Sequence, residues 1–61
     1  MHNLIEIAIM RAQVLTVRIQ GQTQVIKPID IKTQDAQEFV VFIDQNNEQQ
    51  TLRADQISLE L

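Results

Sequence analysis

Cysteine, tryptophan and tyrosine are absent from this chain of 61 residues, and glycine and proline occur once each. Without cysteine there is neither a disulfide nor a thiolate metal site. The only histidine, His2, lies near the terminus, so we expect no histidine-based metal centre and no cofactor. A domain of this length buries roughly 60% of the surface that its unfolded chain exposes. Because no covalent or metal staple supports so small a core, we expect it to gain stability from oligomerisation or from a partner.

Positive charge is also scarce. Eight acidic residues outnumber five basic ones, and the net charge is −3. Proteins that grip nucleic acid through phosphates usually carry a basic surplus. The overall charge therefore argues against nonspecific nucleic-acid binding, but it leaves room for a local basic patch.

No long hydrophobic run is present. The apolar stretch LIEIAIM near the N-terminus spans about seven residues and contains Glu6, which is too short to cross a bilayer. It also lacks the basic region and the small-residue cleavage site of a signal peptide. We expect a cytoplasmic protein that does not bind membranes.

The apolar residues of the sequence recur at regular spacings. Apolar residues at helical spacing, beginning with Leu4 and Ile5, predict a helix over about residues 3–12. Alternating apolar and polar residues then predict five strands, over about 14–20, 24–32, 38–44, 49–53 and 57–61. Gly21 indicates the first hairpin turn, because glycine adopts positive φ without steric cost. The alternation shifts by one residue near Pro28, which is typical of a β-bulge.

This order of elements predicts one domain over residues 1–61, mainly β with one N-terminal helix, built as a small five-stranded SH3/Sm-like barrel. The segment ADQ at 54–56 interrupts the last strand. We expect it to turn that strand so that the strand pairs with the first one and closes the barrel. Phe39 and Phe42 fall on opposite faces of the third strand. We expect both in the core; the alternative is that one of them is a platform for stacked bases.

Four segments in order resemble a WYL domain over about residues 4–58: LIEIAIMRAQVLTVRI, VIKPIDI, EFVVFID and TLRADQI. The resemblance implies a helix followed by an SH3/Sm-like barrel. In that family, aromatic and basic residues are thought to sense ligands, often nucleic acid, for transcription regulators. This chain departs from the pattern in having Phe39, Val40 and Val41 in place of Trp, Tyr and Leu. It also has Gln56 in place of a second closing basic residue, and Arg53 is the residue that carries over.

Two further families are similar in outline. Sm/Hfq-like proteins have a helix and five strands and form rings on RNA, but the chain lacks their lysine-histidine signature before the final strand. Rho-inhibitor (Rof-like) proteins resemble Sm folds and have a similar final corner. They bind a protein, and their acidic balance is closer to that of this chain.

Arg53 is therefore the leading candidate binding residue. Arg18 and Lys27 are expected on adjacent strands across the Gly21 turn, where they would extend a basic patch with Arg53. The alternative is that these are ordinary surface cations and that Arg53 pairs with Asp55 or Asp44, a contact worth at most about 1 kcal/mol.

No catalytic constellation is found, so we expect no enzyme. The sequence favours a non-catalytic, WYL-like binding module in transcription or nucleic-acid regulation, whose ligand is single-stranded nucleic acid or a small anion. The alternatives are an acidic protein-binding inhibitor or adaptor of the Rof-like kind and a structural homo-oligomer.

Overall fold

The computed structural model describes residues 3–59. The described part begins with a helix, α1 (Asn3–Arg11). Five strands follow: β1 (Leu15–Ile19), β2 (Gln22–Gln34), β3 (Gln37–Ile43), β4 (Gln49–Arg53) and β5 (Ile57–Leu59). A single turn of 3₁₀-helix, η1 (Ala54–Gln56), lies between β4 and β5. The prediction of a mainly β fold with one N-terminal helix is confirmed. His2 and the end of the last predicted strand, residues 60–61, lie outside the described residues. The helix in the described part is too short to cross a membrane.

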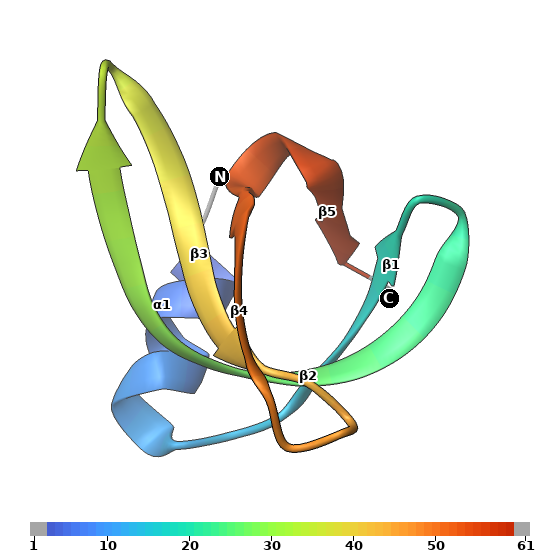
Figure 1. Ribbon diagram of the computed structural model, residues 1–61. Helices are drawn as coiled ribbons and strands as arrows, with labels where there is room; N and C mark the ends of the chain where they lie inside the picture. Colours follow the sequence, from blue (N-terminus) through green and yellow to red (C-terminus); the bar gives the residue numbers. More distant parts are fainter. Residues whose placement is uncertain (1–2, 60–61) are drawn as a thin grey trace.

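The five strands form one antiparallel sheet in the order β4-β3-β2-β1-β5 (Figure 1). The last strand pairs with the first, as predicted, with Arg18 of β1 opposite Ser58 of β5. η1 produces this pairing, because it turns the chain between β4 and β5. Within residues 3–59 no ladder joins β4 to β5, so the sheet is open there and is not closed into a barrel.

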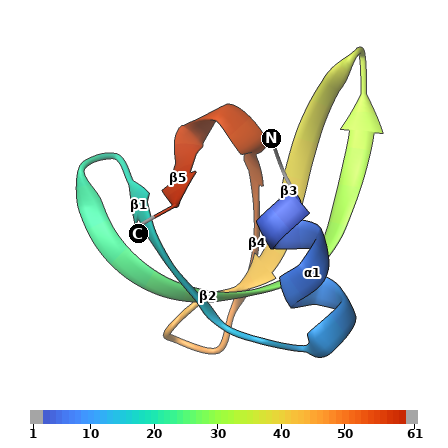
Figure 2. The same ribbon diagram turned by 180° about the vertical axis from the view of Figure 1, so that it is seen from behind.

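β2 belongs to both halves of the sheet. Its first part pairs with β1 and its second part pairs with β3, and the strand curves strongly between them (Figures 1 and 2). Pro28 lies opposite Phe42 and Asp30 lies opposite Val41, which leaves Ile29 as an extra residue. This is the β-bulge that the shifted alternation predicted. A bulge of one residue bends its strand and reverses which side chains face inward beyond it.

The core lies on the inner side of the curved sheet, where each buried aliphatic or aromatic side chain contributes roughly 1.5–3 kcal/mol. Its buried cluster consists of Ile5, Val17, Ile19, Ile26, Val40, Phe42 and Ile57. Ile5 comes from α1, so the helix closes part of the core. Phe39 is half-buried and does not pack against this cluster. The expectation that both phenylalanines are core residues therefore holds for Phe42 and is wrong for Phe39.

The shortage of glycine leaves other residues in left-handed backbone conformations. Positive φ angles occur at Gly21 and, among the residues described, at Ala12, Gln20, Asp35, Ala36 and Asn47. Gln20–Gly21 and Asp35–Ala36 form two-residue hairpin turns with positive φ at both positions, the type I′ geometry that matches strand twist.

The end of α1 needs the same conformation. The N–H of Gln13 donates to the carbonyl of Ala8 at 2.9 Å, and that of Ala12 donates to Ile9 at 3.3 Å. This pair of hydrogen bonds is a Schellman motif, in which the left-handed position is usually glycine. Ala12 occupies that position with φ of 53°. A side chain there is disfavoured by roughly 1–2 kcal/mol because its Cβ approaches the following carbonyl.

Asp44 organises the turn between β3 and β4. Its Oδ1 accepts hydrogen bonds from the backbone N–H groups of Asn46 and Glu48, both at 2.9 Å, and its Oδ2 accepts one from the side chain of Gln50 at 3.0 Å. These bonds, with that of Glu48 the strongest cause, hold the pKa of the Asp44 carboxyl below its ordinary value.

Ala36→Gly should stabilise the protein. The φ of 62° at Ala36 suits glycine, and removing the Cβ should raise the free energy of unfolding by about 0.5–1 kcal/mol after the added freedom of the unfolded chain is subtracted. Urea denaturation followed by circular dichroism measures this. Ala36→Val is the matched opposite and should lower stability. An Ala36→Gly protein no more stable than the wild type would contradict the turn assignment.

Acid should weaken the Asp44 turn. Because the folded-state pKa of Asp44 is lowered, its hydrogen bonds contribute stability above about pH 4, and that contribution disappears as the pH falls through the folded-state pKa. The stability difference between the wild type and Asp44→Asn should therefore shrink between about pH 6 and pH 3. Asp35→Asn is the control, since Asp35 accepts no hydrogen bond from the described residues. A difference that stays constant with pH would contradict the assignment.

Candidate functional site

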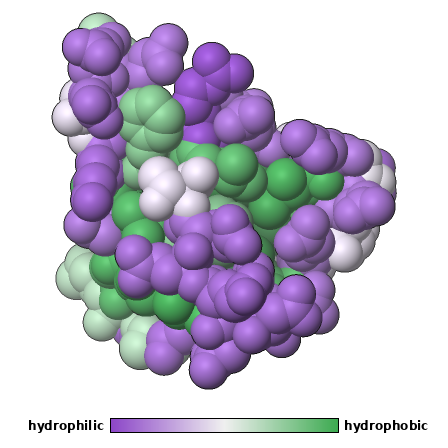
Figure 3. Space-filling model, in the orientation of Figure 1, coloured by the Kyte–Doolittle hydropathy of each residue, from purple (hydrophilic) through white to green (hydrophobic). Residues whose placement is uncertain are grey.

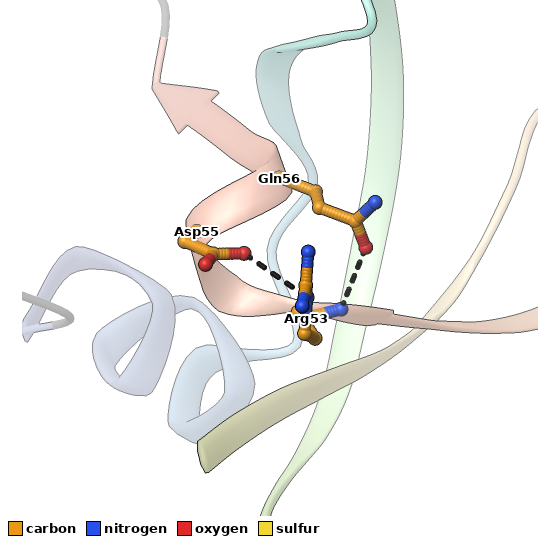
Figure 4. A network of polar contacts seen from close by, with 3 residues as sticks. All are labelled: Arg53, Asp55 and Gln56. Carbon is orange, nitrogen blue, oxygen red and sulfur yellow. Dashed lines mark hydrogen bonds and ion pairs between the residues drawn. The ribbon is translucent and has the colours of Figure 1, made fainter.

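Arg53 stands where β4 ends and η1 begins (Figure 4). Its backbone is extended, and its N–H donates to Oε1 of Gln56 at 3.2 Å, which ties the start of η1 to its last residue. Its side-chain Nε lies 3.4 Å from Oδ1 of Asp55. The ion pair that the sequence offered as an alternative is therefore present. The Arg53 side chain is 45% exposed and that of Asp55 is 74% exposed, so the pair is worth less than about 1 kcal/mol.

A hollow of about 560 Å³ lies between this corner and the tip of the β2–β3 hairpin. Thr33 and Glu38 line it from the hairpin, and Arg53 and Asp55 line it from the corner. An anion in this hollow would meet two carboxylates beside the one guanidinium. The electrostatics of the hollow therefore disfavour it as an anion site.

A second, smaller hollow of about 270 Å³ opens onto the core. Its apolar lining comes from Ile19, Phe42 and Leu52, and its polar lining includes Gln24 and Gln50. Figure 3 shows, in the orientation of Figure 1, apolar surface between polar margins. Asp44 also reaches this hollow, but its carboxylate is already occupied by the hydrogen bonds of its own turn.

The register places the three predicted cations apart. Arg18 of β1 lies opposite Thr23, and Lys27 lies four residues further along β2, or roughly 13 Å along the strand. Lys27 lies opposite Ile43 of β3, whereas Arg53 lies opposite Phe39 at the other end of the same strand. Arg18 and Lys27 are on adjacent strands as expected, but neither neighbours Arg53. Ligand binding by either residue stays a prediction.

A different cation does lie near Arg53. Phe39 on the central strand β3 pairs with Lys32 of β2 on one side and with Arg53 of β4 on the other. Residues directly opposite each other in an antiparallel ladder project from the same face. The face of β3 that points away from the core cluster therefore carries a line of cation, aromatic ring and cation, which we call the Lys32–Phe39–Arg53 row; Val41, two residues further along the same face, is buried. Adjacent strands are about 4.8 Å apart, so the two cationic residues are separated by roughly 10 Å across the ring.

Each member of this row is accessible. Lys32 and Arg53 are exposed and Phe39 is half-buried. Among the described residues, the ammonium group of Lys32 has no hydrogen bond or ion pair. Lys32 was not among the predicted site residues, because the predicted strands over about 24–32 and 38–44 carried no register relative to each other. The available signal was symmetry: Lys32 lies three residues before Asp35 and Phe39 lies three residues after Ala36, so a two-residue turn at 35–36 pairs them.

Within residues 3–59 no group of three or more histidine, cysteine, aspartate or glutamate side chains could hold a metal ion. Comparisons with protein-family models, with curated proteins and with solved structures found no match. The likeness to WYL domains, and the weaker likeness to Sm/Hfq-like and Rof-like proteins, therefore stays a prediction from the residues quoted above.

Gln56→Ala should loosen the corner that positions Arg53. The change removes the acceptor for the Arg53 N–H, and we expect the free energy of unfolding to fall by about 0.5–1.5 kcal/mol. Gln45→Ala is the control, because Gln45 is exposed and makes no side-chain hydrogen bond with the described residues; it should change stability by less than about 0.5 kcal/mol. Equal effects of the two changes in chemical denaturation would show that the hydrogen bond contributes nothing.

Proposed function

We propose that the chain is a non-catalytic binding module, a WYL-like small barrel that acts in transcription or nucleic-acid regulation by holding an anionic ligand at Arg53. The observation that carries this proposal is the Lys32–Phe39–Arg53 row. It concentrates two exposed cations on one face of a protein whose net charge is −3.

The barrel in this proposal is supported by the topology. The meander from β1 to β4, the bend of β2 at its bulge and the return of β5 to pair with β1 are the features from which small barrels are built. A short η1 between the last two strands performs the turn.

The electrostatics support a weak and local site. Two cations on one face of an acidic protein attract an anion that approaches that face. Because both side chains are exposed, added salt should screen the attraction over about 10 Å at 0.1 M ionic strength. The carboxylate of Asp55 already neutralises part of the charge of Arg53, so an anionic ligand competes with it.

A protein-binding inhibitor or adaptor is the second candidate. Its binding surface would be the exposed apolar side of α1, and homo-oligomerisation would use that side too. On α1, Leu4, Ile7 and Met10 are 48%, 41% and 84% exposed. Their spacing of three residues puts them on one stripe of the helix. The open edges of β4 and β5 could also accept a strand from a partner. If one of these surfaces is the binding surface, the row plays no part.

Amide NMR of the labelled protein at low salt tests the proposal with a mixture of single-stranded DNA and RNA oligonucleotides as the probe. We expect shifts centred on Lys32, Phe39 and Arg53 that fade with added salt, since phosphate-driven binding weakens as salt rises. Arg53→Gln should abolish these shifts and Lys27→Gln should preserve them. An unchanged spectrum would refute the proposal. Concentration-dependent shifts along Leu4, Ile7 and Met10 without any probe would favour self-association instead.

A further inference from the structure

We propose that Phe39 is a stacking platform for one unpaired base and that Lys32 and Arg53 hold the phosphates on either side of it, so that the ligand is single-stranded nucleic acid. This inference rests on the proposed function and deepens it, because it adds a base to the anion and Lys32 to Arg53.

The position of Phe39 is unusual for a residue that serves only the core. β3 is the central strand of the β2–β3–β4 half of the sheet, so ladders on both sides fix the backbone of Phe39. Its side chain is nevertheless half-buried and outside the core cluster, unlike that of Phe42 on the opposite face. A ring held by a rigid strand and left partly open is preorganised to receive another ring, since little side-chain freedom is lost on binding.

The neighbours of Phe39 complement a nucleotide. Cross-strand partners have Cβ atoms about 4.5–5.5 Å apart, so Lys32 and Arg53 stand on either side of Phe39. The Nε of Arg53 lies 3.4 Å from Oδ1 of Asp55, so a phosphate competes with that carboxylate for the guanidinium. An aromatic surface between two cations matches a base between two phosphates. Proteins that bind single strands combine these two features, a positively charged path and an aromatic face on which a base stacks.

The same geometry favours a single strand over a duplex. Phe39 lies on the face of a sheet and can stack only on a base whose own face is exposed. In a duplex both faces of an internal base are covered by its neighbours, so a duplex could use Lys32 and Arg53 but not the ring. A strand that stacks on Phe39 and meets both Lys32 and Arg53 crosses the sheet from β2 to β4.

Fluorescence anisotropy at low salt tests the inference with three labelled probes: a twelve-nucleotide oligo-dT strand, an abasic strand of the same length and a dA·dT duplex. The wild type should bind the oligo-dT strand at least about five-fold more tightly than the abasic strand, the lower end of what one stacked base contributes. Phe39→Leu keeps an apolar side chain but removes the ring. In this variant the affinity for the oligo-dT strand should fall to that for the abasic strand, and the affinity for the abasic strand should not weaken.

The two cations give a separate readout. Lys32→Gln should weaken both single strands alike, and it should reduce the slope of log affinity against log salt by about 0.7, the value for one phosphate of a single strand. Lys27→Gln is the matched control, because Lys27 is an exposed lysine on the same strand but lies opposite Ile43. It should leave the preference for oligo-dT unchanged and should weaken binding less than Lys32→Gln does.

The outcomes separate the inference from the proposed function. Equal binding of the oligo-dT and abasic strands by the wild type would overturn the stacking role and leave an anion site at Arg53. Tighter binding of the duplex would overturn the single-strand assignment. No binding of any probe would overturn both proposals. If Phe39→Leu fails to fold, nuclear Overhauser contacts between the Phe39 ring and a thymine methyl in the wild-type complex decide the question, and their absence would refute stacking.

Discussion

The bulge at Ile29 is the constraint on which the rest of the structure depends. Before it, Ile26 and Pro28 face inward and are buried. If the alternation continued unbroken, Lys32 would also face inward. The extra residue reverses the alternation, so that Ile31 packs against the core and Lys32 faces outward. The same residue bends β2, which allows one strand to pair with β1 at one end and with β3 at the other.

Pro28 fits the position next to this bulge. Proline has no N–H to donate, and it is tolerated in a sheet at bulges and edges. Here its side chain is fully buried opposite Phe42, so the residue that interrupts the ladder also fills the core. The packing and the bend therefore depend on the same short segment, and the outward position of Lys32 follows from both.

Scarcity of glycine leaves this small domain strained at its turns. Five residues other than glycine adopt positive φ in the part of the chain from 3 to 59. Small domains have little net stability, so a strain of roughly 1–2 kcal/mol at a turn is a large fraction of the total. The strained pair Asp35–Ala36 is also the turn that sets the register of β2 and β3, and hence the pairing of Lys32 with Phe39.

Much of the fold was predictable because it depends on local patterns. Apolar periodicity located the helix and strands, Gly21 located a turn, and the shift at Pro28 located the bulge. The site was less predictable because it depends on register. Asp35–Ala36 lacks the glycine that usually indicates a type I′ turn, so the pairing of Lys32 with Phe39 was not visible. The expected patch of Arg18 and Lys27 with Arg53 is absent because residues four apart on a strand lie roughly 13 Å from each other.

The central claim is that the bulge sets a register in which Phe39 lies between Lys32 and Arg53. Cross-strand nuclear Overhauser contacts between backbone protons of the free, labelled protein test it most directly. The account predicts contacts from Phe39 to Lys32 and to Arg53, with Ile29 left out of the ladder. Contacts from Phe39 to Ile31 or to Thr33 in place of Lys32 would place the ring on the other face relative to the cations, and would contradict both the register and the site built on it.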